Sequence, residues 1–267
     1  MQRLGVDSDS LGRSESIDTT KSEDLTTLCQ RLHARVQAFI AADAPEGRLR
    51  SVQEQTKTSL KVIEEALDSL DQLSLSYNGG KDCLVLLILF LACLHTKSLS
   101  SRRLSIRSVY ILSKHPFTEV DEFVDECIRV YSLELARYAM PMKQAFEEYL
   151  KEQPNVKAIF VGTRRTDPHG ANLTHFDETD RGWPQFMRIH PVIDWHYAEI
   201  WTFIRHLGIP YCLLYDKGYT SLGGTTDTHP NPALRKEVNT EDKISMTKYR
   251  PAYELIEDNE ERLGRDA

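Results

Sequence analysis

The stretch LSLSYNGGKDCLVLLILFLACLH, residues 73–95, decides the predicted fold. Leu73–Tyr77 has the composition of a short buried strand, and Lys81–His95 that of a helix which is apolar on nearly all sides and therefore buried. Between them, Asn78-Gly79-Gly80 forms a turn in which two glycines let backbone N–H groups face a bound anion. The helix that follows directs its positive dipole end at the same point. The stretch predicts a phosphate site, although by itself a glycine pair after a strand is equally consistent with a plain tight turn.

Short strands and helices alternate through the rest of the chain, which predicts a parallel, doubly wound sheet with helices on both faces. Two amphipathic helices precede the sheet, over Leu25–Ala42 and about Ser51–Leu70, and from Tyr215 onward we expect loops with little regular structure. The further strands are expected at Ile106–Leu112, Leu133–Ala139, Ala158–Gly162 and Met187–Ile193, and the further helices at Thr118–Tyr131, Met142–Lys151 and Tyr197–Leu207. The expected fold class is α/β, with a mostly parallel sheet, N-terminal helices and a loop-rich C-terminal extension.

Charge and composition exclude several classes of partner. The chain of 267 residues carries 33 Lys and Arg against 40 Asp and Glu, a net charge of −7. This balance argues against a nucleic-acid or anionic-membrane surface and leaves small-molecule ligands open. The longest apolar run, Cys83–Leu94, has twelve residues, short of the ~20 that span a bilayer. With no apolar signal segment at the N-terminus and no C-x-x-C among its five cysteines, the chain is expected to be cytoplasmic.

Asp82 strengthens the phosphate-site interpretation. A carboxylate beside a phosphate-binding turn repels the ligand unless it holds Mg²⁺ or orients a hydrogen-bond donor. The alternative is an acid in the first turn of a helix that complements the helix dipole.

The run N-G-G-K-D-C, residues 78–83, resembles the S-G-G-x-D-[ST] pyrophosphate loop of the ATP pyrophosphatase and PAPS reductase-like superfamily. The longer run S-Y-N-G-G-K-D-C, residues 76–83, is similar to the form found in eukaryotic, fungal-type FMN adenylyltransferases (FAD synthetases). Three further segments resemble that family's G-x-R-x-T-D-P, W-P-x-F-M-R and E-R-x-G-R elements: residues 162–168, 183–188 and 261–265. The resemblance covers roughly residues 51–265, and His169 departs from the family's phenylalanine.

The resemblance implies a nucleotidyltransferase that moves the AMP moiety of ATP to the phosphate of FMN, giving FAD and pyrophosphate, with Mg²⁺ as cofactor. It implies one domain over residues 23–267 whose substrate-binding extension starts at about residue 211. The polar composition of residues 1–22 predicts a flexible tail, and the charge balance predicts no nucleic-acid or membrane partner. We expect a monomer. The implied ATP and pyrophosphate contacts are Ser76, Tyr77, Asn78, Gly79, Gly80, Lys81, Asp82, Ile111 and Gly162. The implied FMN contacts are Arg164, Asp167, Asp180, Trp183, Arg188, Arg262 and Arg265. The implied catalytic residues are Asn78, Asp82, Asp167 and Arg262, with Asp82 as the candidate metal ligand.

The cationic candidates have plainer interpretations as well. Arg262 and Arg265 are three residues apart and could reach one phosphate from the same helical face, or could belong to a frayed C-terminus. Trp183 could stack on a flavin ring or could cover the edge of the core. Together with the glycine turn, Arg164, Arg188 and the two C-terminal arginines would form a locally positive pocket in an acidic protein.

Three alternatives to FAD synthesis follow from the same motifs. A PAPS or adenylyl-sulfate reductase needs a nucleophilic cysteine in its C-terminal segment, and no cysteine follows Cys212. A tRNA-modifying enzyme of the same superfamily would need a basic face and usually paired cysteines, and the net charge of −7 and the absence of C-x-x-C oppose it. A non-catalytic flavin- or nucleotide-binding protein stays open.

Overall fold

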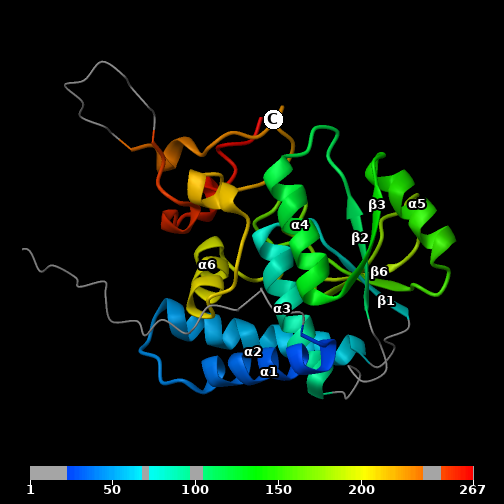
Figure 1. Cartoon of the computed structure of the whole chain (residues 1–267), viewed down its shortest axis with the longest axis horizontal. Helices are drawn as coiled ribbons and strands as arrows, with labels where there is room; N and C mark the ends of the chain where they lie inside the picture. Colours follow the sequence, from blue (N-terminus) through cyan, green and yellow to red (C-terminus); the bar gives the residue numbers. More distant parts are fainter. Residues whose placement is uncertain (1–22, 68–71, 97–104, 237–247, 267) are drawn as a thin grey trace, which may run out of the picture.

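The computed structural model describes residues 23–67, 72–96, 105–236 and 248–266, and its centre is a six-stranded sheet in the order β3-β2-β1-β4-β6-β5 (Figure 1). The strands are β1 (Leu73–Ser76), β2 (Ile106–Ile111), β3 (Leu133–Tyr138), β4 (Ala158–Phe160), β5 (Phe176–Glu178) and β6 (Met187–Ile189). All neighbouring pairs are parallel except β5–β6, which is antiparallel. The predicted α/β fold class is confirmed, and β5 is the strand that the sequence did not predict.

The helices lie close to their predicted positions. They are α1 (Leu25–Ala41), α2 (Arg48–Ala66), α3 (Lys81–Thr96), α4 (Thr118–Tyr131), α5 (Met142–Glu152) and α6 (Tyr197–His206). The first of them begins where the Asp24 carboxylate accepts hydrogen bonds from the backbone N–H groups of Thr26 and Thr27, at 3.0 and 3.1 Å. These are the bonds by which an N-cap satisfies the first turn of a helix. The predicted flexible tail, residues 1–22, and the predicted end of the second helix at about residue 70 lie outside the described residues.

Helices cover both faces of the sheet, as a doubly wound topology requires. On one face α3 lies between the sheet and α1, and every residue from Leu84 to Leu94 is buried (Figure 1). On the other face α5 packs with Phe146 and Tyr149 against Val109 and Ile159 of the sheet. Because α3 is enclosed by apolar neighbours, it has no polar side, which explains its uniformly apolar sequence.

The strand order creates a switch point at the carboxyl ends of two central strands, the place where open α/β sheets form their binding crevice. It reverses at β1, which has β2 on one side and β4 on the other. Leu73 pairs with Ala158 and Leu75 with Phe160, so the segments that follow these two strands emerge side by side. In open α/β sheets this switch point is where ligands bind.

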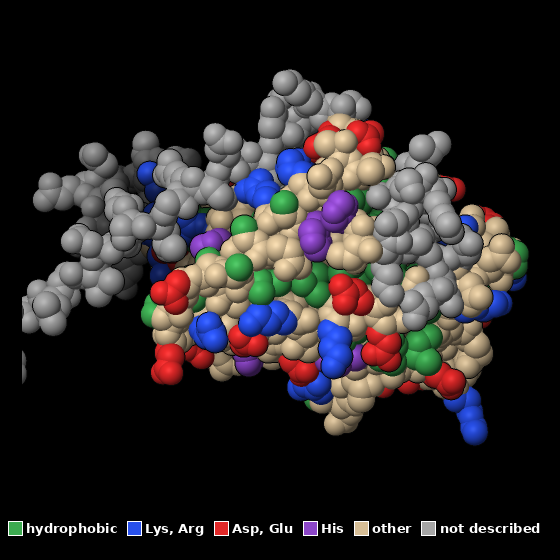
Figure 2. Space-filling model, turned by 90° about the horizontal axis from the view of Figure 1, so that it is seen from below, with side chains coloured by type: hydrophobic (Ala, Val, Ile, Leu, Met, Phe, Trp, Pro, Cys, Tyr) green, Lys and Arg blue, Asp and Glu red, His purple; other side chains and the backbone are tan. Residues whose placement is uncertain are grey.

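The rest of the described chain has little regular structure, as predicted beyond Tyr215. It contains the 3-10 helices η2 (Leu213–Lys217), η3 (Pro232–Leu234), η4 (Ala252–Glu254) and η5 (Asp258–Glu260). On the face formed by α1 and α2, acidic and basic side chains are interspersed (Figure 2). Within the described segments, none of the helices has the length and apolar character required to cross a membrane.

Candidate active site

The turn between β1 and α3 requires glycine at its centre. Gly79 has φ +74°, and a Cβ there would lie 2.8 Å from Cγ2 of Val124 on α4. The Gly80 N–H donates to Asn78 Oδ1 at 2.9 Å, and the Lys81 N–H donates to the Tyr215 hydroxyl, also at 2.9 Å. The turn is therefore fixed by a left-handed residue, by close packing and by its own hydrogen bonds.

The loop after β4 packs directly on the start of α3. A Cβ at Gly162 would lie 2.9 Å from both the backbone nitrogen and the sulfur of Cys83, so this approach also needs glycine. Burial and the neighbouring Asp82 raise the pKa of Cys83 to about 12, although the backbone N–H groups of Asn78 and Gly162 oppose the shift. Cys83 is thus a neutral thiol that joins the two loops, and it is poorly suited to act as a nucleophile.

A buried network of charges lies beneath the two loops. Lys81 Nζ contacts Asp82 Oδ2 at 2.9 Å and Glu261 Oε1 at 2.5 Å. Arg164 Nε lies 2.9 Å from Asp82 Oδ1, and its Nη2 donates to Glu261 Oε2. Arg164 also has Asp167 and Asp258 at 3.7 Å each. Two fully buried cations are therefore held by carboxylates from three separate parts of the chain, which is the condition under which buried charge is tolerated.

Two aspartates of the network, Asp82 and Asp167, have opposite electrostatic balances. Burial would raise the pKa of Asp82, but the charges of Arg164 and Lys81 outweigh it, so this pKa lies below its ordinary value. Burial and the charge of Asp82 raise the pKa of Asp167, and the more distant Arg164 compensates only in part. The negative charge of Asp167 is therefore only partly compensated within the network.

The predicted nucleotide contacts are mostly brought together at this crevice. The turn 78–82 and Gly162 meet there, and Asp167 is held in a tight turn in which its Oδ2 accepts from the Arg164 N–H at 2.8 Å. Ser76 ends β1, and Ile111 ends β2, half-buried against the cluster under α5. The Tyr77 side chain is fully buried and its hydroxyl donates to Cys127 Sγ at 3.0 Å, so it supports the turn from inside.

Arg164, a predicted FMN contact, has no exposed side-chain surface. Its ion-pair partners are all carboxylates of the network. The geometry gives no support to a direct contact with FMN and favours a role in holding the loops.

Asp180, Trp183 and Arg188 lie together on the β5–β6 hairpin. Arg188 Nη2 donates to the Glu178 carbonyl at 2.8 Å and lies 3.6 Å from Asp180 Oδ1, while Trp183 N–H donates to the Asp180 carbonyl at 3.0 Å. Trp183 is half-buried against the cluster under α5, so both interpretations of this residue keep their support. Because β6 is parallel to β4, this hairpin turn lies at the amino edge of the sheet, one three-residue strand (about 10 Å) from the edge with the phosphate turn.

The two C-terminal arginines, Arg262 and Arg265, do not lie on a helix, as a shared helical face would require. The last 3-10 helix ends at Glu260, Arg262 lies in a turn, and Arg265 forms a bridge with Thr228. The expected shared helical face is therefore wrong. Arg262 is exposed, whereas Arg265 Nη2 lies 3.4 Å from Asp227 Oδ1.

Comparison with known proteins gives a consistent result. Residues 72–145 and 137–230 match the phosphoadenosine phosphosulfate reductase domain family. A probable FAD synthase of Schizosaccharomyces pombe is 40% identical over 242 residues, which are 89% of this chain and 88% of that protein. The chain belongs to the FAD synthase family.

Other members of the FAD synthase family support the same assignment. The crystal structure of Candida glabrata FMN adenylyltransferase with FAD and inorganic pyrophosphate matches at a TM-score of 0.85 and 29% identity, over 93% of this chain and 99% of that chain. The crystal structure of yeast FAD synthetase in complex with FAD matches at a TM-score of 0.83 and 30% identity, over 91% of this chain and 100% of that chain. A probable FAD synthase of Caenorhabditis elegans is 35% identical over 86% of this chain, which spans only 43% of that protein.

The PAPS reductase alternative has narrower support. A phosphoadenosine 5'-phosphosulfate reductase of Xylella fastidiosa is 32% identical over 98 residues, only 36% of this chain. The probable FAD synthase of Schizosaccharomyces pombe matches 89% of this chain, against the 36% that this reductase matches.

In this FAD synthase relative, the sequence motifs did not single out two carboxylates of the network, Asp258 and Glu261, or Tyr215, which contacts the glycine turn. Glu261 stands first in E-R-x-G-R, a motif that was interpreted through its arginines alone. Asp258 accepts from the Tyr197 N–H and contacts His196 Nδ1, both at 2.6 Å, and Tyr215 holds the first N–H of α3. A signal was present only for Glu261, as an acid inside a recognised motif.

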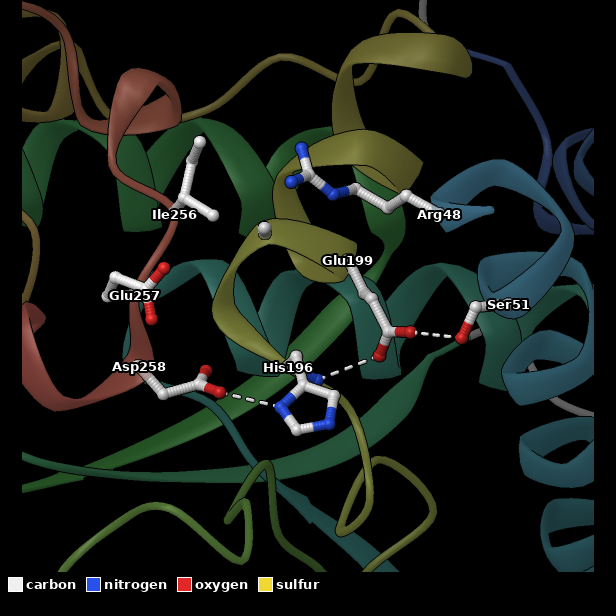
Figure 3. A pocket seen from close by; sticks show the side chains of 8 residues that line it. Arg48, Ser51, His196, Glu199, Ile256, Glu257 and Asp258 are labelled. Carbon is white, nitrogen blue, oxygen red and sulfur yellow. Dashed lines mark hydrogen bonds and ion pairs between the residues drawn. The ribbon is translucent and has the colours of Figure 1, made fainter. Parts of the chain in front are cut away.

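Behind the network lies a pocket of about 330 Å³ at the start of α6 (Figure 3). In this view His196 lies between Asp258 and Glu199, and Glu199 reaches Ser51 of α2. None of the predicted site residues lines this pocket. It meets the network only through Asp258, so it is separate from the crevice between the two loops.

Proposed function

We propose that this chain is an FMN adenylyltransferase that converts ATP and FMN into FAD and pyrophosphate. The observation that carries the proposal is that its similarity to FAD synthases extends over nearly the whole chain. A related structure, that of Candida glabrata FMN adenylyltransferase, is described with FMN and an ATP analogue, AMPCPP. The crevice at the switch point of the sheet is where such a nucleotide would bind.

In the proposed reaction an FMN phosphate oxygen attacks the α-phosphorus of ATP. A bond forms between these two atoms, the bond from the α-phosphorus to the bridging oxygen breaks, and pyrophosphate leaves with the electron pair. The attacking group is already an anion at neutral pH, so no general base is needed. The task of the protein is to position two anions that repel each other and to stabilise charge as it moves.

The charge balance of the network bears on the cofactor. Lys81 and Arg164 supply two positive charges, and Asp82, Asp167, Asp258 and Glu261 supply four negative ones, a formal total of −2. Within the described residues there is no cluster of three or more His, Cys, Asp or Glu side chains that could hold a metal ion. Mg²⁺ is commonly bound through one or two carboxylates together with substrate phosphates. Asp167 fits that manner of binding because its charge is only partly compensated, and Asp82, whose two oxygens already contact Lys81 and Arg164, would join it as a shared ligand.

Asp167 and Asp82 would hold Mg²⁺. The ion, when bound, offsets the negative charge of the nucleotide phosphates. The raised pKa of Asp167 is consistent with a carboxylate that gains from an added cation.

The remaining roles follow from position and charge. The backbone of the glycine turn and the N-terminus of α3 would receive the phosphates that leave, with Asn78 near the α-phosphate. Arg262, exposed beside the network, would contact the FMN phosphate, with Arg265 next to it. The flavin ring would bind at the β5–β6 hairpin, near Asp180, Trp183 and Arg188. Because that hairpin turn lies at the amino edge of the sheet, FMN would extend from the carboxyl edge toward the amino edge.

The decisive experiment is direct. The purified chain is mixed with ATP, Mg²⁺ and FMN, and FAD is measured by HPLC. Formation of FAD with turnover supports the enzyme, whereas binding of FMN without FAD supports the non-catalytic alternative. Asp82→Ala and Arg262→Ala should each lower turnover about 10²–10³-fold, and near-normal turnover of both would refute the assigned site. We further propose a cytoplasmic monomer, which fractionation and gel filtration would test.

A further inference from the structure

Glu261 joins the C-terminal segment to both loops of the crevice through one carboxylate. Oε1 contacts Lys81 Nζ at 2.5 Å, and Oε2 accepts from Arg164 Nη2. Lys81 is the first residue of α3 and follows the glycine turn, whereas Arg164 belongs to the loop after β4. A single side chain thus bridges the two segments that form the switch point, and its own exposed fraction is only 6%.

The backbone of Glu261 is fixed as firmly as its side chain. Its carbonyl accepts a hydrogen bond from Thr220 Oγ1 at 2.6 Å and a longer one from Asn231 Nδ2 at 3.4 Å. Asn231 Nδ2 also donates to the Glu260 carbonyl at 2.7 Å. Thr220 and Asn231 are both buried, with 1% and 0% exposed surface. The position of residue 261 relative to the phosphate turn is therefore determined from two sides.

The next residue in the chain is Arg262, which is exposed. We infer that Glu261 is a positioning residue, which sets the place of Arg262 beside the network. The inference rests on the proposed function, because it concerns the same reaction. A buried ion pair contributes little net stability compared with an apolar packing of equal volume, so the placement of the charged segment is the better explanation for this arrangement.

The inference predicts a distinctive loss of activity. Glu261→Gln keeps the shape of the side chain but loses the charge that holds two cations. It should lower kcat for FAD formation about 10²-fold, since a displacement of about 1 Å has that effect on a catalytic contact. Arg262→Ala should lower kcat about 10²–10³-fold. Because Glu261 acts through Arg262, the double variant should have the kcat of Arg262→Ala alone, to within about threefold.

Two further variants separate positioning from general damage. Glu260→Gln makes the same change of charge one residue earlier, outside the network, and should keep kcat within about twofold. Thr220→Val removes the hydrogen bond that the Thr220 hydroxyl donates to the Glu261 carbonyl and the one that it accepts from Asn231 Nδ2, and it leaves the buried charges in place. It should lower kcat about tenfold, and this loss too should disappear in the Arg262→Ala background.

The readouts are kcat and KM for FMN and for ATP, with circular dichroism and thermal unfolding of each variant. If Glu261→Gln does not fold, Thr220→Val decides the question by the same double-variant comparison. Losses that multiply in the double variants would overturn the inference, as would a normal kcat in both single variants. Absence of FAD formation by the unchanged protein would overturn the proposed function and the inference with it, whereas the other outcomes concern the inference alone.

Discussion

The requirement for glycine at residue 79 can be tested by a stability measurement that separates its two causes. Gly79→Ala would place a Cβ 2.8 Å from Val124 Cγ2 on a backbone with φ +74°. Gly182 provides a matched control, since its φ is +87° and a Cβ there would have nothing within 4 Å. The control carries the cost of the left-handed backbone alone, about 1–2 kcal/mol. Gly79→Ala adds an overpacking cost of about 1–3 kcal/mol.

Gly79→Ala is therefore expected to lose about 2–5 kcal/mol of unfolding free energy, and Gly182→Ala about 1–2 kcal/mol. Urea unfolding followed by circular dichroism measures both. Val124→Ala removes the atom that clashes and by itself costs about 2 kcal/mol. The double variant Gly79→Ala/Val124→Ala should be more stable than the sum of the two single losses by about 1–3 kcal/mol.

Activity gives a second readout of the same change. If Gly79→Ala displaces the turn by about 1 Å, FAD formation should fall about 10²-fold, and Val124→Ala should recover part of it. The reasoning is refuted if the two glycine variants lose equal stability and the valine substitution restores none. In that case the close approach of the turn to α4 would not be what requires glycine there.

Three further predictions concern buried polar groups and charge. Ser59→Ala should cost about 1–3 kcal/mol in urea unfolding, because Trp195 Nε1 donates to Ser59 Oγ at 2.9 Å and both groups are buried. Asp167→Asn should raise stability at pH 7 and lose this advantage in acid. In the unchanged protein, burial and Asp82 raise the pKa of Asp167, so the stability of that protein falls as pH rises from the ordinary pKa of the carboxyl to the raised one. Asp82→Asn should act in the opposite direction and lower the free energy of unfolding at pH 7 by about 1.5–3 kcal/mol. This loss should fade as pH falls through the lowered pKa of Asp82. Equal responses of the two asparagine variants would contradict the charge balance described above.

Local signals in the sequence predicted most elements of the fold well. The predicted helix Thr118–Tyr131 has the same bounds in the structure, and it ends where Ser132 adopts a left-handed conformation with φ 54°. The strand expected over Met187–Ile193 ends at Ile189, because Pro191 has no N–H to continue a ladder. The missed strand, Phe176–Glu178, has three residues and no alternation of its own, and only its pairing with β6 defines it.

The site shows where motif reasoning reaches its limit. The motifs placed the glycine turn and the segment with Gly162 and Asp167 after two neighbouring strands, and the ends of parallel neighbouring strands share one edge of a sheet. They gave no information about partners far away in the chain. Glu261 contacts Lys81 across 180 residues and Arg164 across 97 residues. No spacing or periodicity encodes such contacts, and only the folded C-terminal segment brings them together.

The arginines show the consequence for function. A pocket made positive by free arginines was predicted, but Arg164 lies among carboxylates, Arg188 lies 3.6 Å from Asp180, and Arg265 lies 3.4 Å from Asp227. Each of these cations is already compensated, so its contribution to attracting a polyanion is small compared with its contribution to local structure. Under the proposed function, attraction would then come mainly from Arg262, from the backbone N–H groups that have no partner within the turn and from a cation that arrives with the nucleotide. A protein of net charge −7 would in this way bind the two proposed anionic substrates without a positive surface, because the charges that place them would be supplied at the site itself.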